Sequence, residues 1–162
     1  MIWLTSLGLI FILSFGYVLL YGAPYLPTLK PQIDTGLKLA GLKPGDHLLE
    51  LGCGDGKVLL AAASLGLKVT GYELNPFLAL LAWFRTRAYR SQVTVIWGNF
   101  WTKPWPPADA IYVFLLQKYM SKLDTAINHY QHKPIKLISV AFTVPDKSFD
   151  KQTNGVSVYT YR

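Results

Sequence analysis

The sequence predicts an α/β fold: a doubly wound, mostly parallel sheet with an antiparallel hairpin at its terminal edge, preceded by one N-terminal transmembrane helix. First, apolar strand-like runs alternate with helix-like segments from residue 32 onward. Second, a glycine-rich turn separates the first strand from the next helix. Third, no charged side chain occurs before Lys30. We therefore divide the chain into an anchor at 1–22, a proline-rich linker at 23–31 and one domain at 32–162.

Residues 2–21 predict a membrane-spanning helix. Fifteen of these twenty residues are large apolar or aromatic, and at about 1.5 Å per residue the run matches the roughly 30 Å hydrocarbon core. Trp3 lies at one end and Tyr17 and Tyr21 at the other, where rings prefer the headgroup level. No Lys or Arg precedes the run, which disfavours a cleaved signal peptide. The run shows no polar stripe, which disfavours a buried core helix.

The flanking charges predict the orientation of this anchor. Lys30, Lys38 and Lys43 follow the run, against only the terminal amine before it, so the N-terminus is expected outside and the domain on the cytoplasmic or matrix side. The net charge of +7 suits an anionic lipid surface as a partner. Nothing resembles a nucleic-acid-binding module, so no nucleic acid is expected. One cysteine and three scattered histidines exclude a disulfide framework and predict no metal site.

Local signals predict the elements of the domain. Three prolines and a glycine make 22–31 an extended linker. Pro76 suits the first turn of a helix, and Asn154-Gly155 is a hairpin signal. Helices are expected at 32–42, 57–65, 76–90 and 119–130, and strands at 47–51, 68–72, 93–97, 110–114, 136–143 and 156–161.

Two loops carry the candidate chemistry. The first strand leads into ELGCGDGK at 50–57, whose alternating glycines allow a sharp turn and let a ligand lie against bare main chain. The following helix offers free N–H groups and a partial positive charge. The second strand ends in GYELNP at 71–76, which contains Glu73. An acid at such a strand end, about 20 residues beyond the glycine loop, accepts hydrogen bonds from both ribose hydroxyls of an adenosine ligand.

The residues around the glycines favour one ligand. A dinucleotide loop needs Gly or Ala where this chain has Lys57, and a P-loop needs Ser or Thr where Val58 stands. Glu50 would repel a pyrophosphate, but it suits the ammonium of a methionine moiety, directly or through water. S-adenosylmethionine therefore fits best, ahead of a nicotinamide cofactor or a purely structural turn.

Two further positions have two interpretations each. Asn99, after the third strand, can bond an adenine edge with Phe100 or Trp101 against the ring, or can start a turn followed by two core aromatics. Cys53 lies at a helix N-terminus, where thiols can be activated, but a small residue in a crowded loop is favoured.

Taken in order and spacing, ELGCGDGK, GYELNP and WGNFW (97–101) resemble motifs of the class I S-adenosylmethionine-dependent methyltransferases, which are Rossmann-like. With PYLPT at 24–28 and VFLL at 113–116, the chain resembles more narrowly the small protein-lysine methyltransferases. These comprise the archaeal lysine methyltransferase and the ATP synthase c-subunit lysine methyltransferase family. The resemblance covers about residues 23–145; the segment after the fifth strand is short and matches only loosely.

The resemblance and the loops together imply a site. The PYLPT-like segment would fold over the cofactor and bring Tyr25 and Thr28 to the methyl group. The candidate cofactor-binding residues are Tyr25, Thr28, Glu50, Gly52, Cys53, Gly54, Asp55, Gly56, Glu73, Leu74, Asn75, Asn99 and Phe100. The substrate-channel candidates are Tyr25, Trp101, Phe114 and Tyr119, of which Phe114 suits the core better. No residue is identified as a general base.

The expected activity is methyl transfer from S-adenosylmethionine to a lysine of a protein at or near the membrane, with membrane proteins among the candidate substrates. Displacement at a sulfonium-activated carbon needs mainly alignment, desolvation and a neutral amine. No Asn-Pro-Pro-Tyr type segment follows the fourth strand, which disfavours nucleobase or glutamine amides. The alternatives are a methyltransferase for a lipid or quinone-like amphiphile, and a non-catalytic cofactor-binding membrane module.

Overall fold

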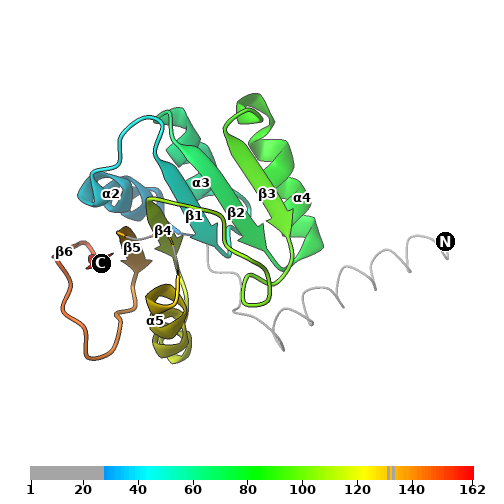
Figure 1. Cartoon of the computed structure of the whole chain (residues 1–162). Coiled ribbons are helices and arrows are strands. Elements are labelled where there is room, and N and C mark those ends of the chain that lie inside the picture. Colours follow the sequence, from blue (N-terminus) through cyan, green and yellow to red (C-terminus); the bar gives the residue numbers. More distant parts are fainter. Residues whose placement is uncertain (1–27, 131, 133) are drawn as a thin grey trace.

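A seven-stranded sheet forms the centre of the domain in a computed structural model of the chain, which describes residues 28–130, 132 and 134–162 (Figure 1). Its strands are β1 (His47–Leu51), β2 (Lys68–Glu73), β3 (Val93–Trp97), β4 (Ala110–Val113), β5 (Ile135–Val140), β6 (Lys151–Thr153) and β7 (Val156–Tyr161). They are ordered β3-β2-β1-β4-β5-β7-β6. The first five pair in parallel, and β7 is antiparallel to both β5 and β6. The predicted mostly parallel sheet with an antiparallel terminal hairpin is confirmed.

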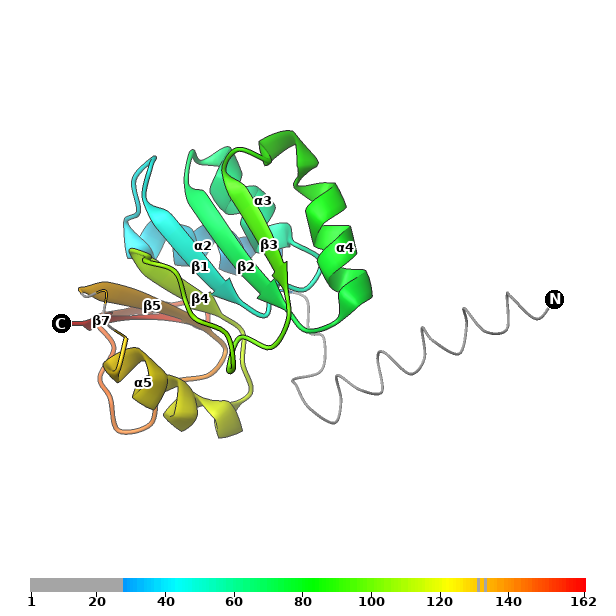
Figure 2. The same cartoon turned by 45° about the vertical axis from the view of Figure 1, so that its right-hand side comes forward.

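Helices cover both faces of the sheet, as the doubly wound prediction requires (Figure 2). The helices are α2 (Lys30–Ala40), α3 (Lys57–Ser64), α4 (Pro76–Arg85) and α5 (Met120–Asn128), with short 3-10 helices η1 (Arg87–Tyr89) and η2 (Gln117–Tyr119). One apolar core joins α2, α3 and α4 to the sheet, and a second joins α5 to the other face. The connection from β3 to β4 contains no helix, and its aromatic side chains pack into the α5 core.

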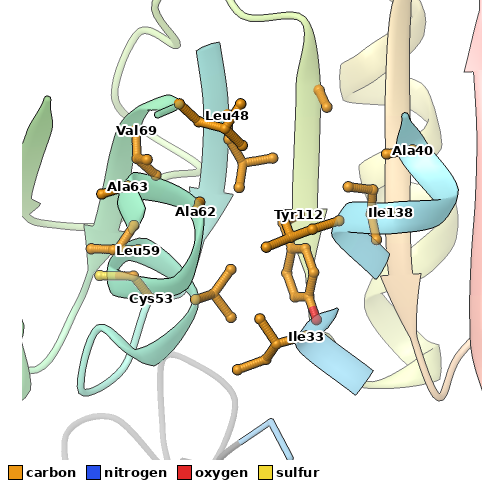
Figure 3. Close-up of a cluster of buried hydrophobic side chains, with 14 of the residues drawn as sticks. Ile33, Ala40, Leu48, Cys53, Leu59, Ala62, Ala63, Val69, Tyr112 and Ile138 are labelled. Atoms are coloured by element: carbon orange, nitrogen blue, oxygen red, sulfur yellow. The ribbon is translucent and has the colours of Figure 1, made fainter. Parts of the chain in front are cut away.

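The alternation of side chains along β1 supplies both cores. Leu48 belongs to the core under α2–α4, which Figure 3 shows around Leu59 and Tyr112, whereas Leu49 and Leu51 belong to the α5 core. Successive side chains on a strand point to opposite faces. Glu50 therefore points to the α2–α4 side of the sheet, whereas its neighbours Leu49 and Leu51 are buried on the other side.

Several element ends differ from the prediction by a few residues, and three of them have a clear local physical reason. The helix expected at 76–90 ends as an α-helix at Arg85, since the Thr86 hydroxyl donates to the carbonyl of Ala82 (2.8 Å) and the chain tightens into η1. The strand expected at 136–143 ends at Val140, because Ala141 turns the chain at φ +66°. The helix expected at 32–42 begins earlier, at Lys30, inside the predicted linker, with proline in its first turn.

The predicted transmembrane helix at 2–21 lies outside the described residues, as does most of the linker at 23–31. Among the residues that the structure describes, no helix has the length and apolar character that crossing a membrane requires.

The close packing of α3 on β2 can be tested at Gly71. A Cβ atom there would lie 2.8 Å from both terminal methyl carbons of Leu59 and 2.9 Å from Cys53 Cβ. We expect Gly71→Ala to lower the free energy of unfolding by about 1–3 kcal/mol through overpacking, measured by urea denaturation. In Leu59→Ala/Gly71→Ala the clash with Leu59 is absent, so the double variant should lose less than the sum of the single losses. Additive losses would contradict this explanation.

Candidate functional site

The predicted residues gather where β1, β2 and β3 end. From β1 the chain runs through α3 to β2 and through α4 to β3 on one side of β1, and then returns to β4 on the other side, so the strand order reverses between β1 and β4. In open α/β sheets, ligands bind in the crevice at the carboxyl ends of the strands at such a reversal. Three loops meet at this edge: 52–56 after β1, 74–75 after β2 and 98–109 after β3.

The glycine loop after β1 is held close to β2 by its own backbone. The amides of Gly52 and Cys53 both donate to the carbonyl of Tyr72, at 2.9 and 2.8 Å. Gly52 has φ +90° and Gly56 has φ +80°, conformations that side chains disfavour. At Gly56 a Cβ atom would also lie 2.9 Å from the Cα of Ala82 in α4. The loop therefore presents bare main chain, as predicted, and brings α3 and α4 close together.

Glu73 links the loops that follow β1 and β2. One of its carboxylate oxygens accepts the amide N–H of Gly54 and the other accepts that of Asn75, both at 2.8 Å. The side chain is buried; burial raises its pKa, while these backbone donors lower it. Each carboxylate oxygen retains a second lone pair. The geometry is thus compatible with the predicted acceptor role toward ribose hydroxyls.

Glu50 is a buried carboxyl group whose hydrogen bonds are incomplete. Its Oε2 atom has no hydrogen-bond partner among the described residues, and the side chain is 5% exposed. Burial raises the pKa of Glu50 well above its ordinary value, with further increases from the charges of Glu73 and Asp55. A buried polar atom without a partner is costly. The arrangement suits a cationic donor such as an ammonium, which would restore the charged form.

Tyr112 is a polar residue of this edge that sequence reasoning missed. It lies beside Glu50 in the parallel ladder of β1 and β4, on the same face. Its hydroxyl is also buried without a partner among the described residues, and burial followed by the Glu50 charge raises its pKa. Figure 3 shows its ring near Ile33 of α2. Side-chain alternation along each strand could have indicated which face Tyr112 occupies. Only the pairing of β1 with β4 shows that Tyr112 and Glu50 are neighbours.

Arg85 is a second residue that the sequence did not identify as part of the site. Its guanidinium donates to the backbone carbonyl of Asp55 at 2.7 Å and forms an ion pair with the Asp55 carboxylate. Lys57 lies 3.5 Å from the same carboxylate. Asp55 therefore fastens the glycine loop to the last turn of α4. The partners are far apart in the sequence, and no local pattern indicates the pair.

The asparagines after β2 and β3 both stabilise turns. Asn75 is fully buried, and its Oδ1 atom caps α4 by accepting the N–H groups of Phe77 and Leu78 at 2.9 and 3.3 Å. Asn99 Oδ1 accepts the amide of Trp101 at 3.0 Å. The turn interpretation of Asn99 thus has structural support, and its adenine contact stays a prediction.

The remaining candidates divide between two places. The ring centroids of Phe100 and Trp101 lie 4.6 Å apart, and those of Trp101 and Tyr119 lie 6.3 Å apart. Phe114 packs instead on the α2–α4 core, with its ring centroid 6.3 Å from that of Phe142. Two of the four substrate-channel candidates are therefore brought together, while Phe114 serves the core.

Four further positions complete the account. Tyr25 lies outside the described residues, and Thr28 is half-buried just before α2. The backbone carbonyl of Leu74 accepts the indole N–H of Trp97 at 3.0 Å. Cys53 is a buried free thiol whose pKa is raised, first by burial and then by the Glu50 charge. It is therefore a small packing residue rather than an activated thiol. The described residues contain no group of three side chains able to hold a metal.

The fold and these loops define a protein with a class I methyltransferase fold. An RNA methyltransferase from Salinibacter ruber, solved with S-adenosyl-L-homocysteine, matches with a TM-score of 0.76 and 26% identity, over 83% of this chain and 93% of that one. A dimethyladenosine transferase from Plasmodium falciparum shares the fold with a TM-score of 0.62 and 21% identity, over 72% of this chain and 43% of that one. The predicted Rossmann-like fold is confirmed.

The chain belongs to the family defined by the ANTKMT methyltransferase domain, whose family model matches residues 50–151. The human lysine N-methyltransferase of the ATP synthase c-subunit is 27% identical over 80% of this chain and 56% of its own length. A mouse adenine nucleotide translocase lysine N-methyltransferase is 30% identical over 75% of this chain and 54% of its own length. A Saccharolobus islandicus protein-lysine N-methyltransferase is 25% identical over 75% of this chain and 78% of its own length. The chain spans a little over half the length of the two mammalian relatives, and the predicted family resemblance is confirmed.

The buried Glu50 predicts opposite effects on stability and on cofactor binding. Because the pKa of Glu50 is raised on folding, the wild-type protein loses stability as pH rises above the ordinary glutamate pKa toward the folded value. The Glu50→Gln variant has no such pH-dependent loss. The difference in melting temperature, variant minus wild type, should therefore be larger at pH 8 than at pH 5. The affinity of the variant for S-adenosylmethionine should fall about tenfold or more, because the ammonium loses a charged partner.

Thermal unfolding at both pH values and calorimetric titration measure the two effects. Asp34→Asn is the matched control, since Asp34 is an exposed carboxylate on α2 that pairs with Lys30 at the surface. It should leave cofactor affinity unchanged. Undiminished affinity in Glu50→Gln would exclude Glu50 as the ammonium partner.

Proposed function

We propose that this chain is a membrane-anchored methyltransferase that transfers the methyl group of S-adenosylmethionine to a lysine side chain of a protein at or near a membrane. The observation that carries the proposal is the unpaired, buried Glu50 carboxyl oxygen, on a strand beside the one that carries Glu73. Glu50 would accept hydrogen bonds from an ammonium, and Glu73 would accept them from ribose hydroxyls. S-adenosylmethionine carries both groups, one at each end. Membership of the ANTKMT domain family supports the same ligand.

The residues around this ligand have distinct tasks in the proposed site. Glu50 would hold the ammonium and Glu73 the ribose, while the glycine loop would leave room for the ligand against main chain. The Asp55–Arg85 ion pair would keep that loop in register with α4. The cofactor supplies a methyl group on a sulfonium, and the protein's contribution is to align it and exclude water.

A lysine substrate is supported by the names of the relatives and by one contact of this chain. The relatives are named as lysine N-methyltransferases of the ATP synthase c-subunit and of the adenine nucleotide translocase. Here the ammonium of Lys122 lies 4.3 Å from the centroid of the Trp101 ring, so this ring can accept a lysine head group. During methyl transfer, positive charge passes from the sulfonium sulfur to the lysine nitrogen. The face of an aromatic ring beside that nitrogen would stabilise the new charge.

The location is part of the proposal and rests on the sequence. The uncharged run at 2–21 would anchor the chain with its N-terminus outside and the domain on the cytoplasmic or matrix side. An anchored site also suits a lipid or quinone-like amphiphile, which is the alternative substrate. A non-catalytic membrane module that only binds the cofactor is the other alternative.

Transfer of a radioactive methyl group separates these possibilities. The purified full-length chain is incubated with tritiated S-adenosylmethionine and detergent-solubilised membranes of its source, and products are separated by gel and by organic extraction. We expect a labelled protein band, with the label on lysine by mass spectrometry, that disappears with Glu73→Ala. Label in the organic phase would favour the amphiphile. Cofactor binding without any label would favour the non-catalytic module.

Two aromatic variants test the place of the substrate lysine. Trp101→Leu should lower kcat about twofold to thirtyfold, as loss of a cation–π contact of about 0.5–2 kcal/mol predicts. It should leave cofactor affinity within about twofold. Phe114→Leu is the matched control, because Phe114 packs on the core, and it should change the melting temperature more than kcat. A larger fall in kcat for Phe114→Leu than for Trp101→Leu would reverse the assignment.

A further inference from the structure

An exposed apolar surface runs along α4 and the edge strand β3. Trp83 is 59% exposed and Trp97 is 65% exposed, both unusual for a residue so large. We call this surface the α4–β3 face; it consists of Leu80, Leu81, Trp83, Phe84 and Trp97. Figures 1 and 2 both place α4 and β3 together at one edge of the domain. None of these side chains has a task in the candidate site described above.

Helix α4 exposes four of its large apolar side chains on the side away from the core. Leu80, Trp83 and Phe84 follow helical spacing along one exposed face, whereas the buried residues of the helix are Ala79 and Ala82. A surface helix normally shows the reverse pattern. At Ala82 the backbone of the glycine loop approaches closely, since a Cβ atom on Gly56 would lie 2.9 Å from the Ala82 Cα atom. The tryptophan, phenylalanine and leucines are not required by packing within the described domain.

The second component of the face is held in place at the edge of the sheet. Within the described residues, β3 pairs only with β2. The indole N–H of Trp97 donates to the Leu74 carbonyl at 3.0 Å, next to the Asn75 cap where α4 begins. The exposed Trp97 ring is thereby fixed on the loop that follows β2. The α4–β3 face therefore begins beside the candidate cofactor site.

The charge around this face has one sign. Residues 74–108 contain four basic side chains and no Asp or Glu. Arg85 turns inward to Asp55, but Arg87 and Arg90 are exposed. The Arg87 guanidinium lies 4.1 Å from the centroid of the Phe84 ring. Tryptophan, phenylalanine and leucine bordered by arginine form the combination that suits the headgroup region of an anionic bilayer.

We propose that the α4–β3 face lies on the surface of an anionic membrane, with Leu80, Trp83 and Phe84 among the lipid headgroups and Arg87 and Arg90 paired with lipid phosphates. The inference deepens the proposed function and rests on its anchor at 2–21. Only the short segment 22–27 separates that run from the described domain, and at no more than about 3.5 Å per residue it spans about 20 Å. An anchored domain is thus confined to the bilayer surface. The contact would hold the loop that follows β2, which borders the candidate cofactor site, close to the lipid headgroups.

Depth measurements on spin labels test this contact in the full-length chain. The chain is reconstituted in vesicles of seven parts phosphatidylcholine to three parts phosphatidylglycerol, with one label at Leu80→Cys or Phe84→Cys. The matched control is Phe149→Cys, an exposed aromatic in the segment that leads to β6. The native Cys53 is buried and should stay unlabelled, which the unsubstituted chain checks. We expect high collision with oxygen and low collision with a water-soluble nickel complex at 80 and 84, and the reverse at 149.

Two other outcomes would overturn the proposal. Labels at 80 and 84 that meet the nickel complex as freely as the label at 149 would show a face in water. Labels shielded from both reagents would show a face covered by protein, either another part of this chain or a second copy.

The role of the arginines is tested by a variant of matched net charge. Arg87→Gln/Arg90→Gln should reduce the ratio of oxygen to nickel collisions at position 80 about threefold or more, since each basic residue near an anionic surface adds to the attraction. Lys43→Gln/Lys68→Gln removes the same charge from exposed positions elsewhere and should leave the ratio unchanged. Equal effects of the two variants would exclude a specific arginine contact. Cofactor affinity, measured in parallel, should remain within about twofold in every variant, so a failed contact is distinguishable from a failed methyl-transfer site.

Discussion

The Glu73 carboxylate is the contact on which the arrangement of the site depends. Its two oxygens accept backbone amides from the loops that follow β1 and β2, and so fix the distance between the glycine turn and the start of α4. A neutral amide side chain has only one oxygen and could not accept both amides in this way. The same buried negative charge contributes to the raised pKa of the Glu50 carboxyl. One side chain thus fixes the geometry of the two loops and, together with burial, contributes to the electrostatics of this edge.

The space available between the helices follows from that contact. With the glycine loop held against β2, the backbone of Gly56 lies so close to Ala82 that a Cβ atom at Gly56 would meet the Ala82 Cα atom at 2.9 Å. Helix α4 buries Ala79 and Ala82, while Leu80, Trp83 and Phe84 lie exposed. The same helix therefore borders the glycine loop on one side and carries the α4–β3 face on the other.

Much of the fold could be predicted because its signals are local. The strands at 47–51, 93–97 and 156–161 have the predicted bounds, since a polar or turn segment precedes each and apolar, aromatic or β-branched residues dominate each run. The prediction makes the helix after β2 too long, because its end at Arg85 is accompanied by a hydrogen bond from the Thr86 hydroxyl back to the Ala82 carbonyl. Apolar residues with helical spacing continue across that break, so periodicity alone does not reveal it.

The order of strands and helices, the glycine turn, and the two acids expected to hold a cationic adenosine ligand could all be predicted from the amino-acid sequence alone. These features depend on residue types at fixed short spacings. Only the tertiary structure decided that Tyr112 stands beside Glu50, that Arg85 closes on Asp55, and that α4 turns its tryptophan and phenylalanine away from the core. Each of these depends on which strands pair and how closely helices approach, and such long-range contacts leave no periodic trace in the chain.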